Sequence, residues 1–244
     1  MVYVVTGGTS GIGKQICKDL CALGHKVVTF YAHDDKKASQ TQKEFEKLGF
    51  ELEIIKCDVS NEEDVKTAFI QVEKKFKKIN GLVNNAGTNV DEFVETCNLQ
   101  SYKNVIETNF IGKMLCSKYA IPLLKKQKNA SIVHIASRMA ARPDTECSAY
   151  CCSESAIITL SQCLALELAS YGIRSNCVSP SLVLTPLAKK GWSKEEITDQ
   201  EASCPRGRLA KMEDVSNAVL FLLGDKADFI NGENIGVNGG SLIK

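Results

Sequence analysis

A cluster of glycines near the start of the chain has the composition of a phosphate-binding loop. The segment Thr6-Gly7-Gly8-Thr9-Ser10-Gly11-Ile12-Gly13 follows a short apolar run and opens directly into a stretch of helical periodicity. Glycine is needed where the chain turns tightly and where backbone must touch a pyrophosphate. The helix that follows would add unpaired N–H groups and a partial positive charge. A glycine cluster alone is also compatible with a plain strand–helix turn, and its G-x-x-x-G-x-G spacing differs from the common dinucleotide fingerprint.

The elements that would hold this loop alternate between strand and helix. Apolar runs of strand length lie at Val2–Val5, Lys26–Tyr31, Glu51–Cys57, Gly81–Asn84, Ser131–Ala136, Ile173–Val178 and Asn234–Val237. Helical patterns lie at Gly11–Leu23, Asp35–Leu48, Glu62–Phe76, Leu99–Lys126, Glu146–Tyr171 and Asp214–Leu223. This alternation predicts an α/β fold of Rossmann type, a doubly wound parallel sheet of about seven strands with helices on both faces. With no linker or repeat, a single dinucleotide-binding domain spanning residues 1–244 is expected.

Local signals predict where some elements begin and which segment covers the site. Ser60 or Asn61 is expected to cap the third helix, and Asp34 and Asp35 are expected at the cap of the second. The least regular stretch runs from Pro180 to Pro205 and holds a short Lys/Glu-rich helix. Ligands of open α/β sheets bind beyond the carboxyl ends of the strands. An excursion after the sixth strand is therefore expected to form a lid over the site.

Composition gives no reason to expect nucleic acid or membrane partners. The formal net charge is +1, and 44% of residues are hydrophobic, an ordinary globular balance. The lysines lie among glutamates on the expected helices, which is typical of a solvated surface. No apolar run approaches the ~20 residues of a membrane span, and Met1 leads into an apolar run too short for a secretory signal. A soluble, cytoplasmic protein is expected.

The cysteines predict packing rather than metal binding. The chain has eleven cysteines, three histidines and no C-x-x-C pair. A zinc site needs four clustered ligands. Without an export signal, reduced thiols packed as small hydrophobic side chains are expected, and no metal site is predicted.

Several ordered motifs together resemble the short-chain dehydrogenase/reductase family over nearly the whole chain. Thr6 to Gly13 is similar to its TGxxxGIG loop, Cys57-Asp58-Val59 to the segment after its third strand, and Asn84-Asn85-Ala86-Gly87 to its NNAG motif. Asn109, Ser137 and Tyr150 match its helix asparagine, its serine and its tyrosine thirteen positions later. Ser179-Pro180 and Thr185-Pro186 resemble its turn after the sixth strand. Gly207-Arg208-Leu209 and the tail at Asn231-Gly232-Glu233 and Val237 to Gly240 make β-ketoacyl-acyl-carrier-protein reductases the closest likeness.

The resemblance implies a reaction and a set of site residues. Hydride passes between C4 of a nicotinamide and a carbonyl carbon, Tyr150 transfers the proton of the oxygen, Ser137 fixes that oxygen, and Asn109 anchors a water of the proton relay. Asp58 would hold the adenine ring, and Thr185 would contact the nicotinamide. The cofactor-binding residues implied are Gly7, Thr9, Ser10, Gly11, Ile12, Gly13, Tyr31, Asp58, Val59, Asn85, Ala86, Gly87, Tyr150, Glu154, Pro180 and Thr185.

Glu154 departs from the family motif and puts the chemistry of Tyr150 in question. The family's YxxSK is here Tyr150-Cys151-Cys152-Ser153-Glu154, so a carboxylate replaces the lysine that lowers the pKa of the tyrosine. A nearby carboxylate raises that pKa instead. No lysine occurs between Lys128 and Lys189, so only a distant segment or another subunit could supply a cation. Glu154 could retune an active reductase, mark a subunit whose catalysis has decayed, or be an engineered substitution; as a carboxylate it could still accept hydrogen bonds from ribose hydroxyls.

The cofactor is expected to be NADP(H) rather than NAD(H). NAD-specific members place an acidic residue at the end of the second strand, to bind the ribose 2′-hydroxyl and repel a 2′-phosphate. The residue there is Tyr31, although Ser10 stands where many NADP-dependent members carry a basic residue.

The function predicted is that of an NADP(H)-dependent oxidoreductase, a carbonyl reductase or alcohol dehydrogenase similar to 3-oxoacyl-carrier-protein reductases. Its substrate would be a small-molecule carbonyl or an acyl group on a carrier. The family implies a homotetramer built on the two long helices and the C-terminal segment. The alternative is a catalytically impaired cofactor-binding subunit, in a heteromer with an intact homologue.

Overall fold

A single parallel sheet of seven strands forms the centre of the molecule. The computed structural model describes residues 1–185 and 193–243. The strands are β1 (Val2–Thr6), β2 (Lys26–Tyr31), β3 (Leu52–Lys56), β4 (Gly81–Asn84), β5 (Ala130–Ile135), β6 (Ile173–Pro180) and β7 (Asn234–Val237). Their order in the sheet is β3-β2-β1-β4-β5-β6-β7, and every neighbouring pair is parallel. The predicted Rossmann-type sheet is confirmed.

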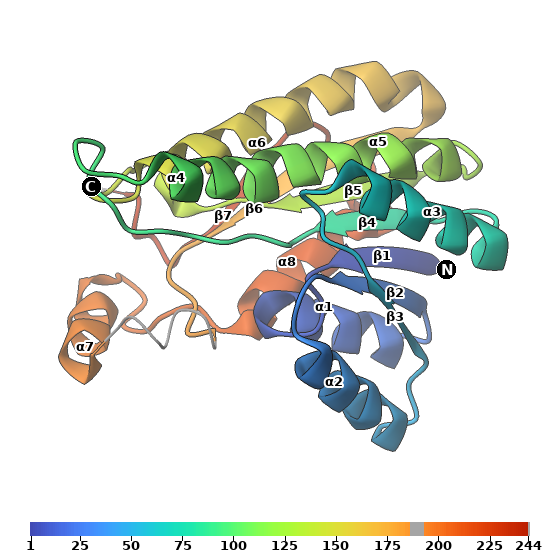
Figure 1. The fold of residues 1–244 in the computed structure, drawn as a ribbon, viewed down its shortest axis with the longest axis horizontal. Helices are drawn as coiled ribbons and strands as arrows, with labels where there is room; N and C mark the ends of the chain where they lie inside the picture. Colours follow the sequence, from blue (N-terminus) through green and yellow to red (C-terminus); the bar gives the residue numbers. More distant parts are fainter. Residues whose placement is uncertain (186–192, 244) are drawn as a thin grey trace.

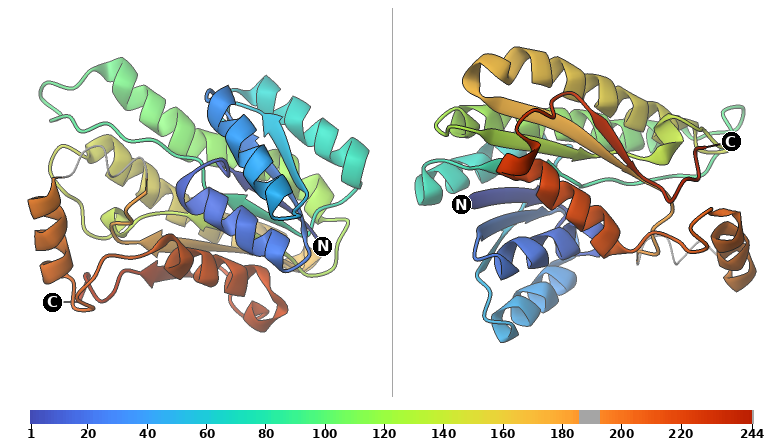
Figure 2. Two further views of the ribbon diagram at one scale, coloured as in Figure 1. Left: turned by 90° about the horizontal axis from the view of Figure 1, so that it is seen from below. Right: turned by 180° about the vertical axis from the view of Figure 1, so that it is seen from behind.

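Helices cover both faces of this sheet (Figure 1). They are α1 (Gly11–Ala22), α2 (Asp35–Lys47), α3 (Glu62–Phe76), α4 (Leu99–Ile106), α5 (Gly112–Leu124), α6 (Ser148–Leu168), α7 (Lys194–Ser203) and α8 (Met212–Leu223). Figure 2 shows α5 and α6 on the opposite side of the sheet from α1 and α8. Each layer encloses its own core, one around Phe30, Phe69 and Leu124 and the other around Ile16, Phe45 and Leu222.

The long helix expected at Leu99–Lys126 is interrupted. A π-helical turn, Glu107–Ile111, joins α4 to α5. Single π turns are rare inside helices and are frequent at functional sites. Asn109 lies within this turn and its side chain is fully buried. The interruption therefore coincides with a residue that the family motif singles out.

The excursion after β6 is described only in part. Its residues 186–192, which include Pro186 and Lys189, lie outside the described residues. The short helix predicted there is α7, which begins at a capping box formed by Ser193 and Glu196. In Figure 1, α7 lies beyond the carboxyl ends of the strands. That place agrees with the predicted lid, whose closing motion stays a prediction.

One helix, residues 148–171, is long and apolar enough to cross a membrane by length and composition. Core helices of water-soluble proteins pass the same test. Ile157, Leu164 and Leu168 of this helix are buried in the cores described above or in the small cluster beside them. All eleven cysteines are free thiols, and buried ones such as Cys17 and Cys116 pack as apolar side chains.

Candidate active site

The glycine loop lies at the point where the order of the sheet reverses. From β1 the chain proceeds to β2 and β3 on one side, and then crosses to β4 on the other. Open α/β sheets bind ligands in the crevice at the carboxyl ends of the strands that flank such a point. The loop from Gly7 to Ser10 follows β1, and Asn85 to Gly87 follow β4. Two of the predicted motifs thus meet at this crevice.

The two loops are joined by hydrogen bonds. The Thr6 hydroxyl accepts from the backbone N–H groups of Asn85 and Ala86, both at 2.9 Å. The Asn85 side-chain amide donates to the carbonyl oxygen of Thr6 at 2.9 Å. A methyl group added at Gly13 would lie 2.4 Å from Nδ2 of Asn85 and 2.5 Å from the carbonyl oxygen of Gly7. Gly13 is therefore required for the close approach of α1 to both loops.

The start of α1 fits the phosphates of a dinucleotide. Its first turn contains no acidic residue, and the Ser10 side chain at its N-cap makes no capping hydrogen bond. The first N–H groups of a helix have no partner within the helix and favour an anion. Gly7 and Gly11 adopt positive φ of 70° and 53°, a conformation that favours glycine. The loop and helix together can hold a pyrophosphate.

Asn109 connects the Asn85–Gly87 loop to α6. Its Oδ1 accepts from the backbone N–H of Thr88 at 2.8 Å, and its Nδ2 donates to the carbonyl oxygen of Thr88 at 2.9 Å. The same Nδ2 lies 3.2 Å from the Ser153 hydroxyl and 3.4 Å from Oε1 of Glu154. The π turn thus aims a single amide at two segments of the predicted site.

Ser137 and Tyr150 are brought together at the carboxyl end of β5. Ser137 follows that strand and caps a short 3₁₀ turn by accepting from the backbone N–H of Met139 at 3.1 Å. Tyr150 lies in the first turns of α6, and burial raises the pKa of its phenol well above the ordinary value. The Glu154 carboxylate raises it further, whereas the hydrogen bond with Ser137 lowers it. Tyr150 is therefore held in its protonated form, as a proton donor requires.

Glu154 is paired with a lysine that lies outside the family motif. Nζ of Lys113, on α5, lies 3.6 Å from Oε1 of Glu154, and both side chains are 3% exposed. The same ammonium donates to the carbonyl oxygen of Ile135 at 2.6 Å. Burial raises the pKa of the Glu154 carboxyl, and Lys113 opposes that shift. The distant segment that the sequence required to supply a cation is therefore α5.

A buried polar cluster continues from Lys113 into the sheet. The Asn84 amide donates to the Lys113 carbonyl oxygen at 3.2 Å and to the Ser117 hydroxyl at 3.0 Å, and it contacts Nδ1 of His134 at 3.2 Å. His134 is fully buried on β5, and burial, followed by the charge of Lys113, lowers the pKa of its imidazole to about 3. A neutral histidine is consistent with a cation close by.

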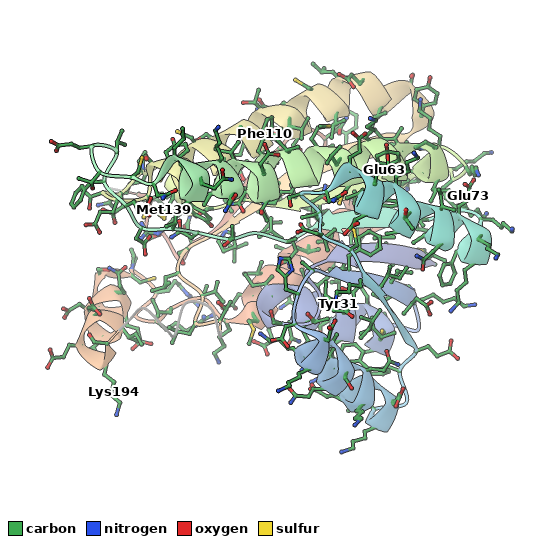
Figure 3. The ribbon with its side chains drawn as sticks, viewed as in Figure 1. Tyr31, Glu63, Glu73, Phe110, Met139 and Lys194 are labelled. Carbon is green, nitrogen blue, oxygen red and sulfur yellow. The ribbon has the colours of Figure 1, made fainter. Side chains whose placement is uncertain are left out.

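The predicted adenosine end lies at the edge formed by β2 and β3. Asp58 accepts from the Ser60 backbone N–H and hydroxyl, and its Oδ2 lies 3.7 Å from Nε2 of His33. Asp58 and His33 line a hollow of about 490 Å³ together with Lys56 and Asn61. Figure 3 shows Tyr31 in the β2–β3 half, apart from Phe110 and Met139, which follow Asn109 and Ser137 by one and two residues. The structure thus forms two groups of predicted residues rather than one.

The caps near this edge correct one expectation. Asp34 caps α2 by accepting from the Lys37 backbone N–H at 2.8 Å, and Asn61 caps α3. Asp35 begins α2 and puts its negative charge in the first turn, as expected, but its side chain does not cap the helix: it accepts from the Tyr31 hydroxyl at 3.0 Å and pairs with Nζ of Lys56 at 2.9 Å. The Asp35 carboxylate, which contacts the side chain at the end of β2, is therefore already balanced by a lysine.

The remaining predicted residues lie around the crevice. Val59 packs against α5, where a methyl group added at Gly112 would lie 2.8 Å from Cγ2 of Val59. Pro180 is the last residue of β6, and Thr185 lies near the glycine loop, with its side-chain carbons 3.4 Å from a methyl group added at Gly11. These contacts place the start of the excursion after β6 over the phosphate loop.

Lys113 is the site residue that sequence reasoning missed. The sequence indicated that a cation would come from a distant segment or another subunit, but not from which one, because the pair forms between two different helices. One signal was present: Lys113 follows Asn109 by four residues, as Glu154 follows Tyr150. Residues four apart share one face of a helix, so both charged residues lie one turn beyond a motif residue.

Comparisons with known proteins agree with this fold. A family model described as enoyl-(acyl carrier protein) reductase matches residues 7–241. The 3-oxoacyl-[acyl-carrier-protein] reductase FabG of Staphylococcus aureus is 32% identical over 239 residues, which cover 97% of this chain and 96% of the relative. The L-xylulose reductase of Caenorhabditis elegans is 36% identical over 242 residues, covering 97% and 94%. The aldohexose dehydrogenase of Thermoplasma acidophilum has a TM-score of 0.91 at 32% identity, covering 100% of this chain and 94% of that structure.

A parallel sheet with a glycine loop at its switch point defines a dinucleotide-binding α/β protein. The chain belongs to the short-chain dehydrogenase/reductase family. This family is one of oxidoreductases, and its fold implies binding of NAD(P). The names of the relatives include acyl-carrier and sugar substrates, so family membership defines the class of reaction and not the substrate.

Proposed function

We propose that this protein is an NADPH-dependent carbonyl reductase, similar to 3-oxoacyl-carrier-protein reductases, with Tyr150 as its general acid. The observation that supports it most is the meeting of Ser137 and Tyr150 at the carboxyl end of β5, beside the amide of Asn109. A hydroxyl and a protonated phenol close together can fix a carbonyl oxygen and protonate it. The glycine loop at the adjoining strand ends fits the cofactor phosphates.

The side chains would divide the work as follows. Bound in the crevice, the nicotinamide supplies hydride to the carbonyl carbon of the substrate. The Ser137 hydroxyl donates a hydrogen bond to the carbonyl oxygen and fixes its position. Tyr150 gives its proton to that oxygen as negative charge develops there, and recovers a proton from solvent afterwards. Asn109 fixes the position of Glu154 relative to the loop after β4, because its side chain contacts both.

The preference for NADPH rests on the end of β2. Tyr31 stands where an acidic residue would repel a 2′-phosphate, and the charge of nearby Asp35 is balanced by Lys56. Exposed His33 and Lys56 line the adjoining hollow with their donor groups. A phosphate on the ribose would therefore meet no unbalanced carboxylate at Tyr31.

Fluorescence titration tests the cofactor proposal. NADPH should bind with a Kd on the order of 1 μM, equivalent to about −8 kcal/mol, and more tightly than NADH. Tyr31→Asp adds a carboxylate at the end of β2 and should weaken NADPH binding about tenfold relative to NADH through charge repulsion. Tyr31→Asn is the matched neutral control and should keep the preference. Tighter binding of NADH by the wild type would overturn the assignment of NADPH.

A second candidate function follows from Glu154. Because the raised pKa of Tyr150 also makes its phenol a weaker acid, the chain could bind cofactor without turning over and partner an intact homologue. NADPH binding without reduction of any carbonyl in a broad panel would favour this candidate. Co-purification with a homologue that has lysine in the YxxSK motif would support it directly.

The proposal extends to assembly and location. A single domain spanning residues 1–244, acting in the cytoplasm as a homotetramer, is the arrangement we infer from the family resemblance. Leu166 on α6, 84% exposed, and Ile243 in the C-terminal segment, 82% exposed, lie on segments that the family's tetramer would use. Light scattering of the purified protein measures the number of subunits.

A further inference from the structure

The pair of Lys113 and Glu154 is a buried charge pair directly behind the proposed proton donor. Glu154 follows Tyr150 by one helical turn on α6, and Lys113, near the start of α5, follows Asn109 of the preceding π turn by four residues. The ammonium contacts the Ile135 carbonyl oxygen at 2.6 Å and Oε1 of Glu154 at 3.6 Å. Two charges this deeply buried are retained only when they are paired.

We propose that Lys113 is a positioning residue of this active site, which holds Glu154 as a carboxylate behind Tyr150. The cation of the site has moved from α6 to α5, and a fixed carboxylate takes the place of the family's lysine. This carboxylate faces the tyrosine and accepts hydrogen bonds from the sugar hydroxyls of the cofactor. The inference rests on the proposed function, because it assigns a role toward the same cofactor.

The charge state of Glu154 follows from its surroundings. A protonated Glu154 would leave the Lys113 ammonium 3% exposed with a neutral carbonyl oxygen as its contact, which is costly for a full charge. The other titratable groups that face the pair are Tyr150 on α6, His134 on β5 and Cys177 on β6. None is a cation at neutral pH, since the pKa of His134 is lowered to about 3. Among the described residues, Lys113 is thus the cation that balances Glu154.

The position of the pair is fixed from both helices. Oε1 of Glu154 takes the contacts with Lys113 and with Nδ2 of Asn109 at 3.4 Å. The carbonyl oxygen of Lys113 accepts from Ser117 at 2.7 Å and from Asn84 at 3.2 Å, which fixes this turn of α5. The Glu154 carboxylate is thus held through one oxygen by groups from α5 and from the π turn before it, which gives it a defined orientation toward the crevice.

The test is NADPH binding between about pH 6 and about pH 9, the range that brackets neutral conditions. Wild type, Lys113→Met, Glu154→Gln and the double variant are titrated by fluorescence. In Lys113→Met, Glu154 loses its counter-ion and should take up a proton within this range. The Kd of Lys113→Met for NADPH, divided by the wild-type Kd, should then be about tenfold larger at the acid end of the range than at the alkaline end. The reason is that hydrogen bonds to a carboxylate are roughly twice as strong as neutral ones. The ratio should be independent of pH in both proteins that carry Glu154→Gln.

The controls separate the possible outcomes. The 2′-phosphate of NADPH titrates near pH 6, about where free phosphomonoesters do, but it is common to all four proteins and cancels in the ratio. A pH-independent ratio for Lys113→Met means a merely structural lysine and overturns the inference. Absence of NADPH and NADH binding by the wild type rejects the proposed function instead.

An infrared measurement needs neither cofactor nor a stable Lys113 variant. The difference spectrum of wild type minus Glu154→Gln at neutral pH should contain carboxylate bands. A carboxylic-acid carbonyl band in that spectrum would show a neutral Glu154 and would overturn the inference without any reference to cofactor binding.

Discussion

At the residue scale, Tyr150 differs from an ordinary phenol because its surroundings favour the proton. Burial and the Glu154 carboxylate raise its pKa, and Ser137 opposes that shift only in part. The acid form needed to protonate an alkoxide is therefore abundant, whereas the base form needed to oxidise an alcohol is scarce. The site is thus suited to reduction.

This bias gives a prediction for the pH profiles of the two directions. Reduction should show no loss attributable to Tyr150 ionisation up to about pH 10, the ordinary pKa of tyrosine. Oxidation should rise about tenfold per pH unit without reaching a plateau below that pH. Initial rates in both directions over a pH series measure this. Efficient oxidation that is already constant near neutral pH would mean that a cation lowers the pKa of Tyr150 after all.

The Lys113–Glu154 pair predicts what happens when the family's lysine is restored alone. Glu154→Lys places a second ammonium beside Lys113 in a buried site, and should lower the free energy of unfolding by about 3–5 kcal/mol, the usual cost of breaking a buried pair. Lys113→Met combined with Glu154→Lys leaves one ammonium, and should recover most of that loss. Denaturant unfolding of the three proteins gives the comparison. Equal stability of the single and double variants would show that the two positions do not interact.

At the element scale, the sheet and the helices position motifs that lie far apart in sequence. The alternation of apolar runs with helical patterns predicted every strand, because each periodicity reflects which faces the element buries. The strand boundaries agree within two residues, as at β6, which extends to Pro180 instead of Val178. The interruption of the long helix was not predicted, because a π turn of a single turn's length at Glu107–Ile111 is too short to be told from the helical pattern on either side of it.

In the candidate site, too, some residues could be predicted from the sequence and others could not. The glycine loop, Asn85 to Gly87, Ser137 and Tyr150 could be predicted because local motifs carry them. Lys113 could not be predicted from α6, because its pairing with Glu154 depends on how α5 packs against that helix. The partner of Asp35 was missed for the same reason, since Lys56 comes from the neighbouring strand β3.

The contact between α1 and the loop after β4 predicts a loss of cofactor binding in Gly13→Ala. The added methyl group would meet Asn85 and the Gly7 backbone at 2.4 and 2.5 Å, so the phosphate loop must shift. NADPH affinity should fall at least tenfold, equivalent to about 1.4 kcal/mol. Gly224→Ala is the matched control, because its methyl group would lie no closer than 3.4 Å to its neighbours and the backbone φ is −86°. Unchanged affinity in Gly13→Ala would show that the loop tolerates displacement.

At the scale of the whole molecule, one buried histidine links folding to pH. His134 is neutral in the folded protein, because its pKa is lowered to about 3. The unfolded chain binds this proton below its ordinary pKa of about 6.5. The stabilisation is therefore complete above about pH 6.5 and is lost as the pH falls toward the folded value.

Acid unfolding tests this linkage. Between about pH 6.5 and about pH 5, the free energy of unfolding of wild type should fall on the order of 2 kcal/mol more than that of His134→Asn, since one pKa unit corresponds to about 1.4 kcal/mol. Parallel curves for wild type and His134→Asn would contradict a neutral buried His134.

The proposed function requires that Tyr150 donates the proton in a carbonyl reduction. The direct measurement is the oxidation of NADPH by purified protein in the presence of a panel of ketones and 3-oxoacyl thioesters, with wild type and Tyr150→Phe compared on the substrate that reacts fastest. The expected result is reduction of at least one carbonyl by wild type and a loss of about 10²–10⁴-fold in Tyr150→Phe, the range for general acid catalysis, with NADPH affinity retained. Equal rates in the two proteins, or NADPH binding by wild type without reduction of any carbonyl in the panel, would contradict it.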